Sequence, residues 1–338
     1  YVLKKDRLGP GEAGFVTKNG QGLVYVDPSE LPNENKVQIS AAQRVWIKGF
    51  FDQFETALYG VNYKDPVNGY EKFIDVDSFI DQHILVELAK NIDGYRLSAF
   101  MYKDREGKLN MGPAWDYNLS LGNANYLTGE NPTGWYYTQI GGADYPWYGR
   151  LQQDPAYMSR YKERWFAFRQ NEFAQTNLLG QIDAYVTLLT EAEVRDHKKW
   201  PVLGVYVWPN SFIGKTYMEE INFMKDWLTK RLAWIDSQFI SVPVFSQKGG
   251  VIDPGFSLTI TTLTGNILYT IDGTDPKAAD GSRSPSALDY TGPIIINVNT
   301  KVRARTNIGA SWSAITEATF YTEIPPLVIT EIMYKPAP

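Results

Sequence analysis

The sequence of 338 residues contains no cysteine and only two histidines, His83 and His197. The lack of cysteine excludes disulfide bonds and thiolate metal centres, and two histidines argue against a His-rich zinc centre or a Ser-His-Asp triad. The formal net charge is −5, whereas domains that bind nucleic acid usually carry a basic face. No apolar run reaches the roughly 20 residues of a membrane-spanning helix. We therefore expect a globular protein with no nucleic-acid partner and no membrane span in this sequence.

Aromatic residues, by contrast, make up 14% of the chain. Tryptophan and tyrosine fill large cores, and they also line carbohydrate and nucleotide sites. The length exceeds one ordinary hydrophobic core and predicts two domains. The chain starts at Tyr1, within a strand-like run, and not at a methionine. We therefore expect a processed or truncated product of a longer protein.

The first part of the chain, residues 1–240, has the pattern of an α+β domain that is mainly helical with hairpins. Short strands with glycine turns are expected in residues 1–27. Apolar residues at a helical period predict helices over residues 40–59, 75–89 and most of 155–239. Ser40 fits the N-cap of the first of these helices. The segments "LSAFMYKD" and "KLNMGPAWDYN" flank a polar link with glycine and predict a β-hairpin.

The chain becomes all-β after Phe239. Short alternating segments follow one another at the spacing of an immunoglobulin-like sandwich: "FSLTITTL", "NILYTID", "PIIINV", "KVRARTN" and "ATFYT". We place this sandwich at residues 243–322. The final residues, 327–338, have the pattern of the first strand of a further β-domain.

Two aspartates stand out in residues 91–123. Asp93 follows the second predicted helix, and Asp116 lies between Trp115 and Tyr117 where the second hairpin strand ends. Two carboxylates on one cleft could serve as the acid and base of a glycosidase, as the hydroxyl-orienting and Mg²⁺-binding groups of a phosphotransferase, or within a calcium site. The structural alternative is that Asp93 caps a turn and Asp116 accepts backbone hydrogen bonds.

The order of the parts favours phosphotransfer. Kinase active sites are assembled from a helix, an aspartate that orients the hydroxyl, a hairpin, and a second aspartate that chelates Mg²⁺ and is followed by glycine. The segments "NIDGYRLSAFMYKD" and "GPAWDYNLSLGN", together with "WPVLGVYVWPN" and "WLTKRLAWID", resemble the spore coat protein H (CotH) kinase-like family, an atypical branch of the kinase fold. The resemblance covers roughly residues 1–240 and rests on separated motifs in the same order.

The resemblance implies roles for individual residues, with Mg²⁺ and ATP as cofactors. Asp93 matches the catalytic aspartate and Asp116 the metal-binding aspartate. Two positions depart from the family pattern. Ser98 stands where many members have a metal-binding asparagine, and Asn118 stands where the tryptophan motif often has a second aspartate. Both substitutes keep an oxygen for the metal but lose charge or reach, which weakens the site without abolishing it.

Three further residues are candidates for the same site. Asn123 offers another oxygen ligand, Arg96 can steady a carboxylate or a phosphate or form a surface salt bridge, and Trp115 adjoins the second aspartate.

The small lobe of a kinase is not assignable in this sequence. Kinases need a glycine-rich cover and a strand lysine that positions the phosphates. Lys4 and Lys5 are too near the start to belong to a complete small lobe. We therefore expect the nucleotide-clamping segment upstream of Tyr1, so that these residues hold half of an active site.

The remaining aromatic residues and His83 could serve either in packing or in binding. His83 is expected to be buried and structural. Residues 124–150 predict a long aromatic loop, which either forms a sugar or peptide platform or covers the helical core. Its members are Trp135, Tyr136, Tyr137, Tyr145, Trp147 and Tyr148. Trp200 and Trp208 are expected to pack in the core.

The segments "LYTIDGTDP", "YTGPIIIN" and "KVRARTNIGASWS" resemble the immunoglobulin-like module at the C-terminus of chitobiases and β-hexosaminidases. Such modules commonly act as spacers or interaction domains. The segment "LVITEIMYKPAP" is similar to the opening of a lamin-tail-like β-domain. This series of modules implies a bacterial protein that is secreted or attached to the cell surface.

Two functions of different classes follow. The first is an atypical protein kinase that transfers phosphate from ATP, with Mg²⁺, to a protein substrate. The second is a non-catalytic binding module, in which a degenerate kinase fold and the sandwich recognise glycan or another cell-surface component. Asp93 and Asp116 favour the first, whereas Ser98 and Asn118 favour the second. In either case we expect a monomer.

Overall fold

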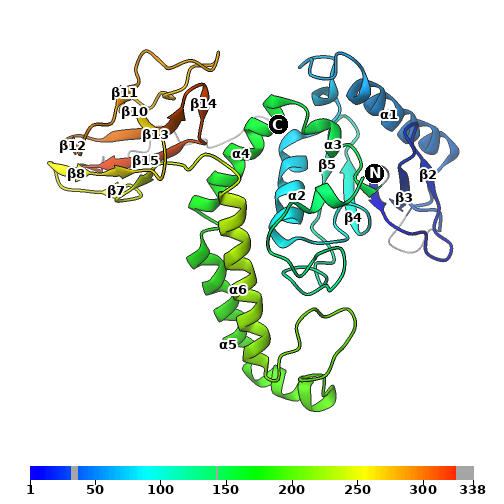
Figure 1. The fold of residues 1–338 in the computed structure, drawn as a ribbon. Helices are drawn as coiled ribbons and strands as arrows, with labels where there is room; N and C mark the ends of the chain where they lie inside the picture. The colour runs from blue at the N-terminus through cyan, green and yellow to red at the C-terminus, as the bar shows by residue number, and fades with distance from the viewer. Residues whose placement is uncertain (32–36, 142–143, 325–338) are drawn as a thin grey trace, which may run out of the picture. The chain divides into compact units, whose positions relative to one another are not determined.

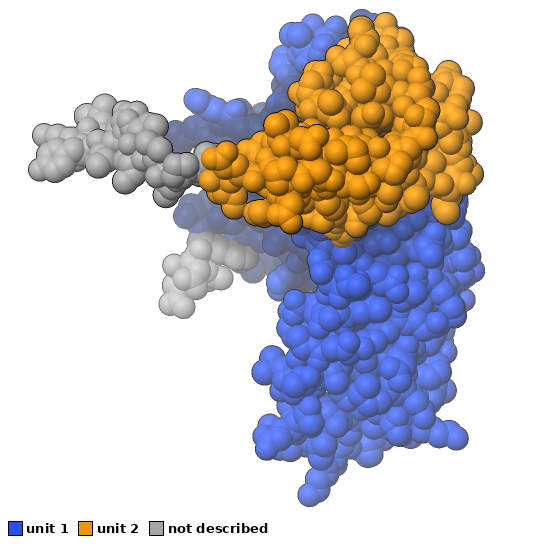
Figure 2. Space-filling model, turned by 90° about the vertical axis from the view of Figure 1, so that its left-hand side faces the viewer, with its two compact units in different colours: residues 1–238 blue, residues 239–338 orange. Residues whose placement is uncertain are grey.

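The computed structural model describes residues 1–31, 37–141 and 144–324. The chain divides into two compact units, residues 1–238 and 239–338, which Figure 2 shows in different colours. The first unit combines helices with one sheet, and the described part of the second unit is built from strands (Figure 1). The predicted fold class, an α+β domain followed by an all-β sandwich, is confirmed.

A five-stranded antiparallel sheet joins the start of the first unit to the predicted hairpin. Its strands, in spatial order, are β2 (Gly14–Val16), β3 (Gly22–Asp27), β1 (Val2–Lys5), β4 (Ala99–Lys103) and β5 (Leu109–Met111). β1 pairs with β3 on one side and with β4 on the other. The predicted hairpin is confirmed, because β4 pairs with β5. The sheet therefore holds the strand that begins shortly after Asp93.

Side-chain caps define where the first two long helices begin. The helices of the first unit are α1 (Ala41–Tyr59), the short 3₁₀ helix η1 (Tyr70–Lys72), α2 (Val76–Ala89), the 3₁₀ helix η2 (Tyr136–Gln139), α3 (Tyr148–Leu151), α4 (Pro155–Gln170), α5 (Gln175–Lys199) and α6 (Tyr217–Asp236). The predicted N-cap Ser40 is confirmed, since its hydroxyl accepts the N–H of Gln43, whose side chain accepts the N–H of Ser40. Asp75 caps α2 by accepting the N–H of Ser78. Both predicted helices are confirmed.

α2 is the central helix of the first unit. Ten of its fourteen residues are buried, which is the pattern of a helix surrounded by other elements on most sides. It contacts α4, α6 and β5, and Figure 1 shows it beside the hairpin. The chain that follows α2, beginning at Lys90, therefore runs through the interior of the unit.

The aromatic segment 124–150 is only partly the loop that the sequence predicted, because η2 and α3 form within it. Its buried aromatic side chains are Tyr136, Tyr145, Trp147 and Tyr148. These residues cover the core, which favours the packing interpretation over a ligand platform. His83 is buried and its ring lies 4.9 Å, centroid to centroid, from that of Tyr161, so its structural role is confirmed.

The prediction that Trp200 and Trp208 pack in the core is wrong. The two side chains are 58% and 69% exposed. Both lie in the segment that connects α5 to α6. α5 has no buried residue, so this end of the unit offers no core for the two rings to fill.

The second unit is assembled from one larger sheet and two short strand pairs. The larger sheet runs in the order β11 (Leu288–Asp289), β10 (Asn266–Thr270), β13 (Thr300–Ile308), β15 (Thr316–Tyr321) and β7 (Gly250–Val251), and β14 (Ser311–Trp312) pairs with β13. The short pairs are β8 (Phe256–Leu258) with β12 (Ile294–Ile296) and β6 (Val244–Phe245) with β9 (Ile260–Thr261). Leu258, Val302 and Phe320 are fully buried at its centre. Residues 327–338, predicted to open a further β-domain, lie outside the described residues.

The buried His83 predicts a loss of stability in acid. Burial lowers the pKa of His83 to about 3, whereas an unfolded histidine has a pKa near 6.5. The unfolded chain therefore binds the extra proton below pH about 6.5, and stability should fall by up to about 1.4 kcal/mol per pH unit as pH drops towards 3. Urea unfolding of the wild type and His83→Phe across this range measures the effect, and the variant should have the shallower acid slope.

His197→Gln is the matched control for this measurement, because it removes the other histidine, which pairs with Glu193 on α5. Equal acid slopes for wild type and His83→Phe would show that His83 is not a buried neutral group.

Candidate active site

The candidate site begins where α2 ends. Lys90 adopts a left-handed backbone conformation, with φ 47°, and its N–H donates to the carbonyl of Glu87. The next residue, Asn91, is fully buried. Its side-chain oxygen accepts the N–H of Asp93 at 3.1 Å, and its side-chain nitrogen donates to the main-chain carbonyl of Asp116 at 3.3 Å. One buried amide therefore holds together the chain segments of both predicted aspartates.

The carboxylate of Asp93 is paired with a cation. Its Oδ1 accepts a hydrogen bond from Arg96 Nη2 at 2.7 Å, and Arg96 Nε donates to the carbonyl of Ile92 at 3.2 Å. The two charged side chains are 19% and 23% exposed, so the pair lies at the surface of the unit. The predicted salt bridge of Arg96 is confirmed, and its partner is the candidate catalytic aspartate. The guanidinium orients this carboxylate and leaves its second oxygen for other donors.

Asp116 lies beside Ser98, the second predicted metal-binding position. Its Oδ2 accepts a hydrogen bond from Ser98 Oγ at 3.3 Å, and the Asp116 side chain is exposed. Both residues have positive φ, 60° and 51°, a region that side chains rarely adopt. With Lys90 and Leu121, they are four of the seven non-glycine residues of this kind in the described chain. Backbone strain gathered at one place is typical of a functional site.

The loop after Asp116 folds back onto the end of α2. The N–H of Leu121 donates to the carbonyl of Ala89 at 2.7 Å. Asn123 Nδ2 donates to the main-chain carbonyl of Asn118 at 2.9 Å. The structure thus places both asparagines on the loop of Asp116, with the side chain of Asn118 exposed.

Helix α6 covers this loop at Gly122. The glycine has φ 87°, and a Cβ built on it would lie 2.5 Å from Trp227 Cδ1, so a larger residue would displace the helix or the loop. Trp227 also donates its indole N–H to the carbonyl of Glu130 at 2.9 Å. α6 therefore holds this loop in place in addition to α2.

The last predicted candidate, Trp115, is an exposed aromatic residue next to Asp116. Its side chain is 58% exposed, and its ring packs edge-on against Phe100 with centroids 5.6 Å apart. The structure therefore places Trp115 against Phe100, next in sequence to the metal-binding candidate.

A second exposed aromatic group adjoins Asp93. Residues 122–126 pair with residues 206–211 through main-chain hydrogen bonds of 2.9 and 2.8 Å. Trp208 stacks on Tyr126 with ring centroids 5.9 Å apart and an angle of 11° between the planes. Burial raises the pKa of the Tyr126 hydroxyl, and the negative charge of Asp93 raises it further. The hydroxyl of Tyr126 therefore lies within electrostatic reach of Asp93.

The oxygen groups around Asp116 fit one kind of metal site. In the described ranges, no group of three or more His, Cys, Asp or Glu side chains could hold a metal. Mg²⁺ in phosphotransfer sites takes one or two carboxylates and completes its octahedron with waters and phosphate oxygens. Asp116, with the hydroxyl of Ser98 and the amide of Asn118 nearby, fits an ion that arrives with a nucleotide, and not an all-protein cage.

Asn91 and Lys90 were not among the predicted site residues, although they lie two and three positions before Asp93. For Asn91 a signal was present, because asparagine side chains often accept the N–H of the residue two positions on. Its second bond, to Asp116, spans 25 positions and has no local signature. For Lys90 no signal exists in a single sequence, because lysine at a helix end is usually exposed.

An aspartate after a helix, a hairpin, and a second aspartate whose main chain is bonded to the same helix end follow the order expected of a kinase-like site. The model of the family described as CotH kinase protein matches residues 24–235, more than half of the sequence. The chain therefore belongs to the CotH kinase protein family. A second family model, described as Fn3 associated, matches residues 256–320 in the second unit. No curated protein matches the chain. Among the described helices, none is both long and apolar enough to cross a membrane.

The Asn91 amide yields a direct stability prediction. Asn91→Leu keeps the branching and the number of heavy atoms of the side chain but leaves the Asp93 N–H and the Asp116 carbonyl without their partner. We expect a loss of about 1–3 kcal/mol in the free energy of unfolding, the cost of an unsatisfied buried polar group. Hydrogen exchange should accelerate in residues 91–98 and in residues 116–123 together. Denaturant unfolding and exchange mass spectrometry measure the two effects.

The control is Asn110→Leu, because the amide of Asn110 bonds only locally, to the carbonyl of Lys108 at 2.8 Å. Acceleration confined to residues 91–98 would contradict the link between the two segments.

Proposed function

We propose that this kinase-like protein transfers the γ-phosphate of ATP, with Mg²⁺, to a hydroxyl group of a protein substrate. The observation that carries the proposal is the buried amide of Asn91, which ties the segments of Asp93 and Asp116 to one helix end. Membership of the CotH kinase protein family supports it. Phosphoryl transfer asks little covalent chemistry of a protein, and positioning with charge stabilisation supplies most of the rate.

The proposal gives each residue of the site one role. Asp93 orients the acceptor hydroxyl and accepts its proton as the oxygen attacks the γ-phosphorus, while the bond from that phosphorus to the bridging oxygen breaks and ADP leaves. Arg96 holds the carboxylate of Asp93 in place through one oxygen, so the other oxygen faces the acceptor. Asp116 holds Mg²⁺ with Ser98 and Asn118. The bound ion supplies positive charge that neutralises the phosphate oxygens.

We further propose that the protein works outside a bacterial cell or on its surface, as a monomer. The support is the β-sandwich unit that follows the kinase-like domain, because modules of this type commonly act as spacers or interaction domains. The acceptor is then a protein or another component of the same surface.

The exposed aromatic residues favour a second candidate function, recognition of glycan or another surface component without catalysis. Trp208 is 69% exposed and stacks on Tyr126, and Trp115 is 58% exposed. Exposed aromatic side chains of this kind can line carbohydrate sites. Under this second function, Asp93 and Asp116 are remnants of a kinase site, and the substitutions at Ser98 and Asn118 reflect the loss of metal binding.

Nucleotide binding separates the two functions. Mg²⁺-ATP should raise the unfolding temperature of the full-length protein, because a ligand that binds only the folded state stabilises it by about 2.7 kcal/mol at a hundredfold excess over Kd. Asp116→Asn should abolish this shift without unfolding the domain. Asp93→Asn should keep most of the shift and abolish transfer of labelled phosphate. Scanning fluorimetry and a phosphate-incorporation assay provide the measurements.

Asp104→Asn is the control variant, because Asp104 is exposed in the hairpin turn of the same unit. If Mg²⁺-ATP produces no shift in the wild type and an oligosaccharide does, the binding-module function replaces the kinase function.

A further inference from the structure

A buried lysine occupies the position where α2 ends. Lys90 has no exposed surface, although glycine is the usual residue at a left-handed helix terminus. Its Nζ donates to the carbonyls of Asn131 at 2.8 Å and Thr133 at 2.9 Å. Burial lowers the pKa of Lys90 to about 8, and the positive charge of Arg231 acts in the same direction. The chain thus keeps an unfavourable buried cation immediately before Asn91.

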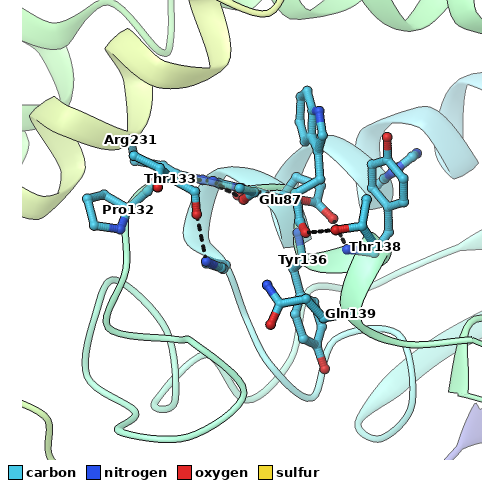
Figure 3. A network of polar contacts seen from close by, with 12 residues as sticks. Glu87, Pro132, Thr133, Tyr136, Thr138, Gln139 and Arg231 are labelled. Carbon is cyan, nitrogen blue, oxygen red and sulfur yellow. Dashed lines mark hydrogen bonds and ion pairs between the residues drawn. The ribbon is translucent and has the colours of Figure 1, made fainter.

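A second buried cation, Arg231 of α6, binds the same chain segment as the Lys90 ammonium group, residues 131–134. Its Nη1 donates to the carbonyls of Pro132 at 3.0 Å and Gly134 at 2.7 Å. Its Nε donates to the carbonyl of Glu87 at 2.8 Å, and its Nη2 contacts the Glu87 carboxylate at 3.1 Å. Both side chains of this ion pair are 0% exposed. Figure 3 shows Arg231, Glu87 and Pro132 in one network of polar contacts.

Glu87 completes the network from within α2. Its carboxylate accepts the backbone N–H groups of Tyr136 and Tyr137, each at 2.9 Å, and the hydroxyl of Tyr95 at 3.1 Å. Burial raises the pKa of Glu87, while the charge of Arg231 and these hydrogen bonds oppose the rise. Each charged group of the network therefore has its partners: Lys90 and Arg231 bind the carbonyls of residues 131–134, and Arg231 pairs with Glu87. Removing any one of them leaves a buried polar group unpaired.

The network connects directly to the candidate site. Lys90 is bonded covalently to Asn91, whose amide holds the segments of Asp93 and Asp116. In the loop of Asp116, the N–H of Leu121 also donates a hydrogen bond to the carbonyl of Ala89, the last residue of α2. A displacement of the end of α2 would therefore move both aspartates relative to the rest of the unit.

We propose that Lys90 and Arg231 are positioning residues of the phosphotransfer site. By binding the carbonyls of residues 131–134 they fix the end of α2, and with it the placement of Asp93 and Asp116 relative to the rest of the unit. The inference rests on the proposed function. Both cations are buried, so they act through Asn91 and not by touching a substrate. Small displacements matter, because misplacing reacting groups by about 1 Å can reduce a rate about a hundredfold.

The test compares Lys90→Met with Arg169→Met in the full-length protein. Methionine keeps most of the lysine stem and removes its charge and both hydrogen bonds. Arg169 of α4 pairs with Asp236 at the end of α6 at 2.9 Å, so its loss breaks an ion pair on α6 that includes no residue of α2. We expect Lys90→Met to lower kcat for phosphate transfer about tenfold to a hundredfold, with KM for ATP changed less than about threefold. Arg169→Met should change neither by more than about twofold.

Hydrogen exchange of the unliganded proteins gives a readout that does not depend on activity. In Lys90→Met the amides of residues 91–98 and 116–123 should exchange about tenfold faster than in Arg169→Met. Each variant is measured at the same temperature interval below its own melting temperature. Arg231→Lys, which keeps the buried charge and loses the fork of donors, gives the same comparison if Lys90→Met does not fold.

The outcomes distinguish the two claims. If the wild type transfers phosphate and Lys90→Met keeps its kcat, the positioning role is wrong. If the wild type transfers no phosphate, the proposed function fails, and exchange alone then decides the positioning role. Unchanged exchange in residues 91–98 and 116–123 of Lys90→Met would overturn it.

Discussion

The side-chain amide of Asn91 is the interaction on which the candidate site depends. An amide both accepts and donates, so this single buried group bonds the N–H of Asp93 and the carbonyl of Asp116, which no strand pairing joins directly. A carboxylate at this position could not donate, and an apolar residue could do neither. The strained backbone at Ser98 and Asp116 costs on the order of 1–3 kcal/mol for each residue, and it persists because the surrounding hydrogen bonds determine the path of the chain.

The polar network of Lys90, Arg231 and Glu87 explains why the end of α2, just before Asn91, is held in a fixed position. Helix ends leave carbonyls unsatisfied and tend to fray. Here Arg231 of α6 binds the carbonyl of Glu87 in the last turn, and Lys90 binds the carbonyls of Asn131 and Thr133 in the segment before η2. The end of α2 is therefore tied to two other parts of the first unit. Its packing against α4, α6 and β5 completes the support.

Local patterns in the sequence predicted the local parts of this structure. The cap Ser40, the two helices and the hairpin follow from periodicity and turn chemistry within a few residues, and Asp93 and Asp116 were found from the order of motifs. The sequence could not reveal the Arg231–Glu87 pair, which joins residues 144 positions apart. Trp208 was misassigned because hydrophobicity alone does not show whether a core exists at its end of the unit.

The most direct measurement of the central claim is the position of a metal ion in crystals of the full-length protein with Mn²⁺ and a non-hydrolysable ATP analogue. We expect an anomalous peak at a coordination distance of about 2.1 Å from the Asp116 carboxylate, with the terminal phosphate between Asp116 and Asp93. A nucleotide and metal bound elsewhere, or a terminal phosphate that Asp93 does not face, would contradict it.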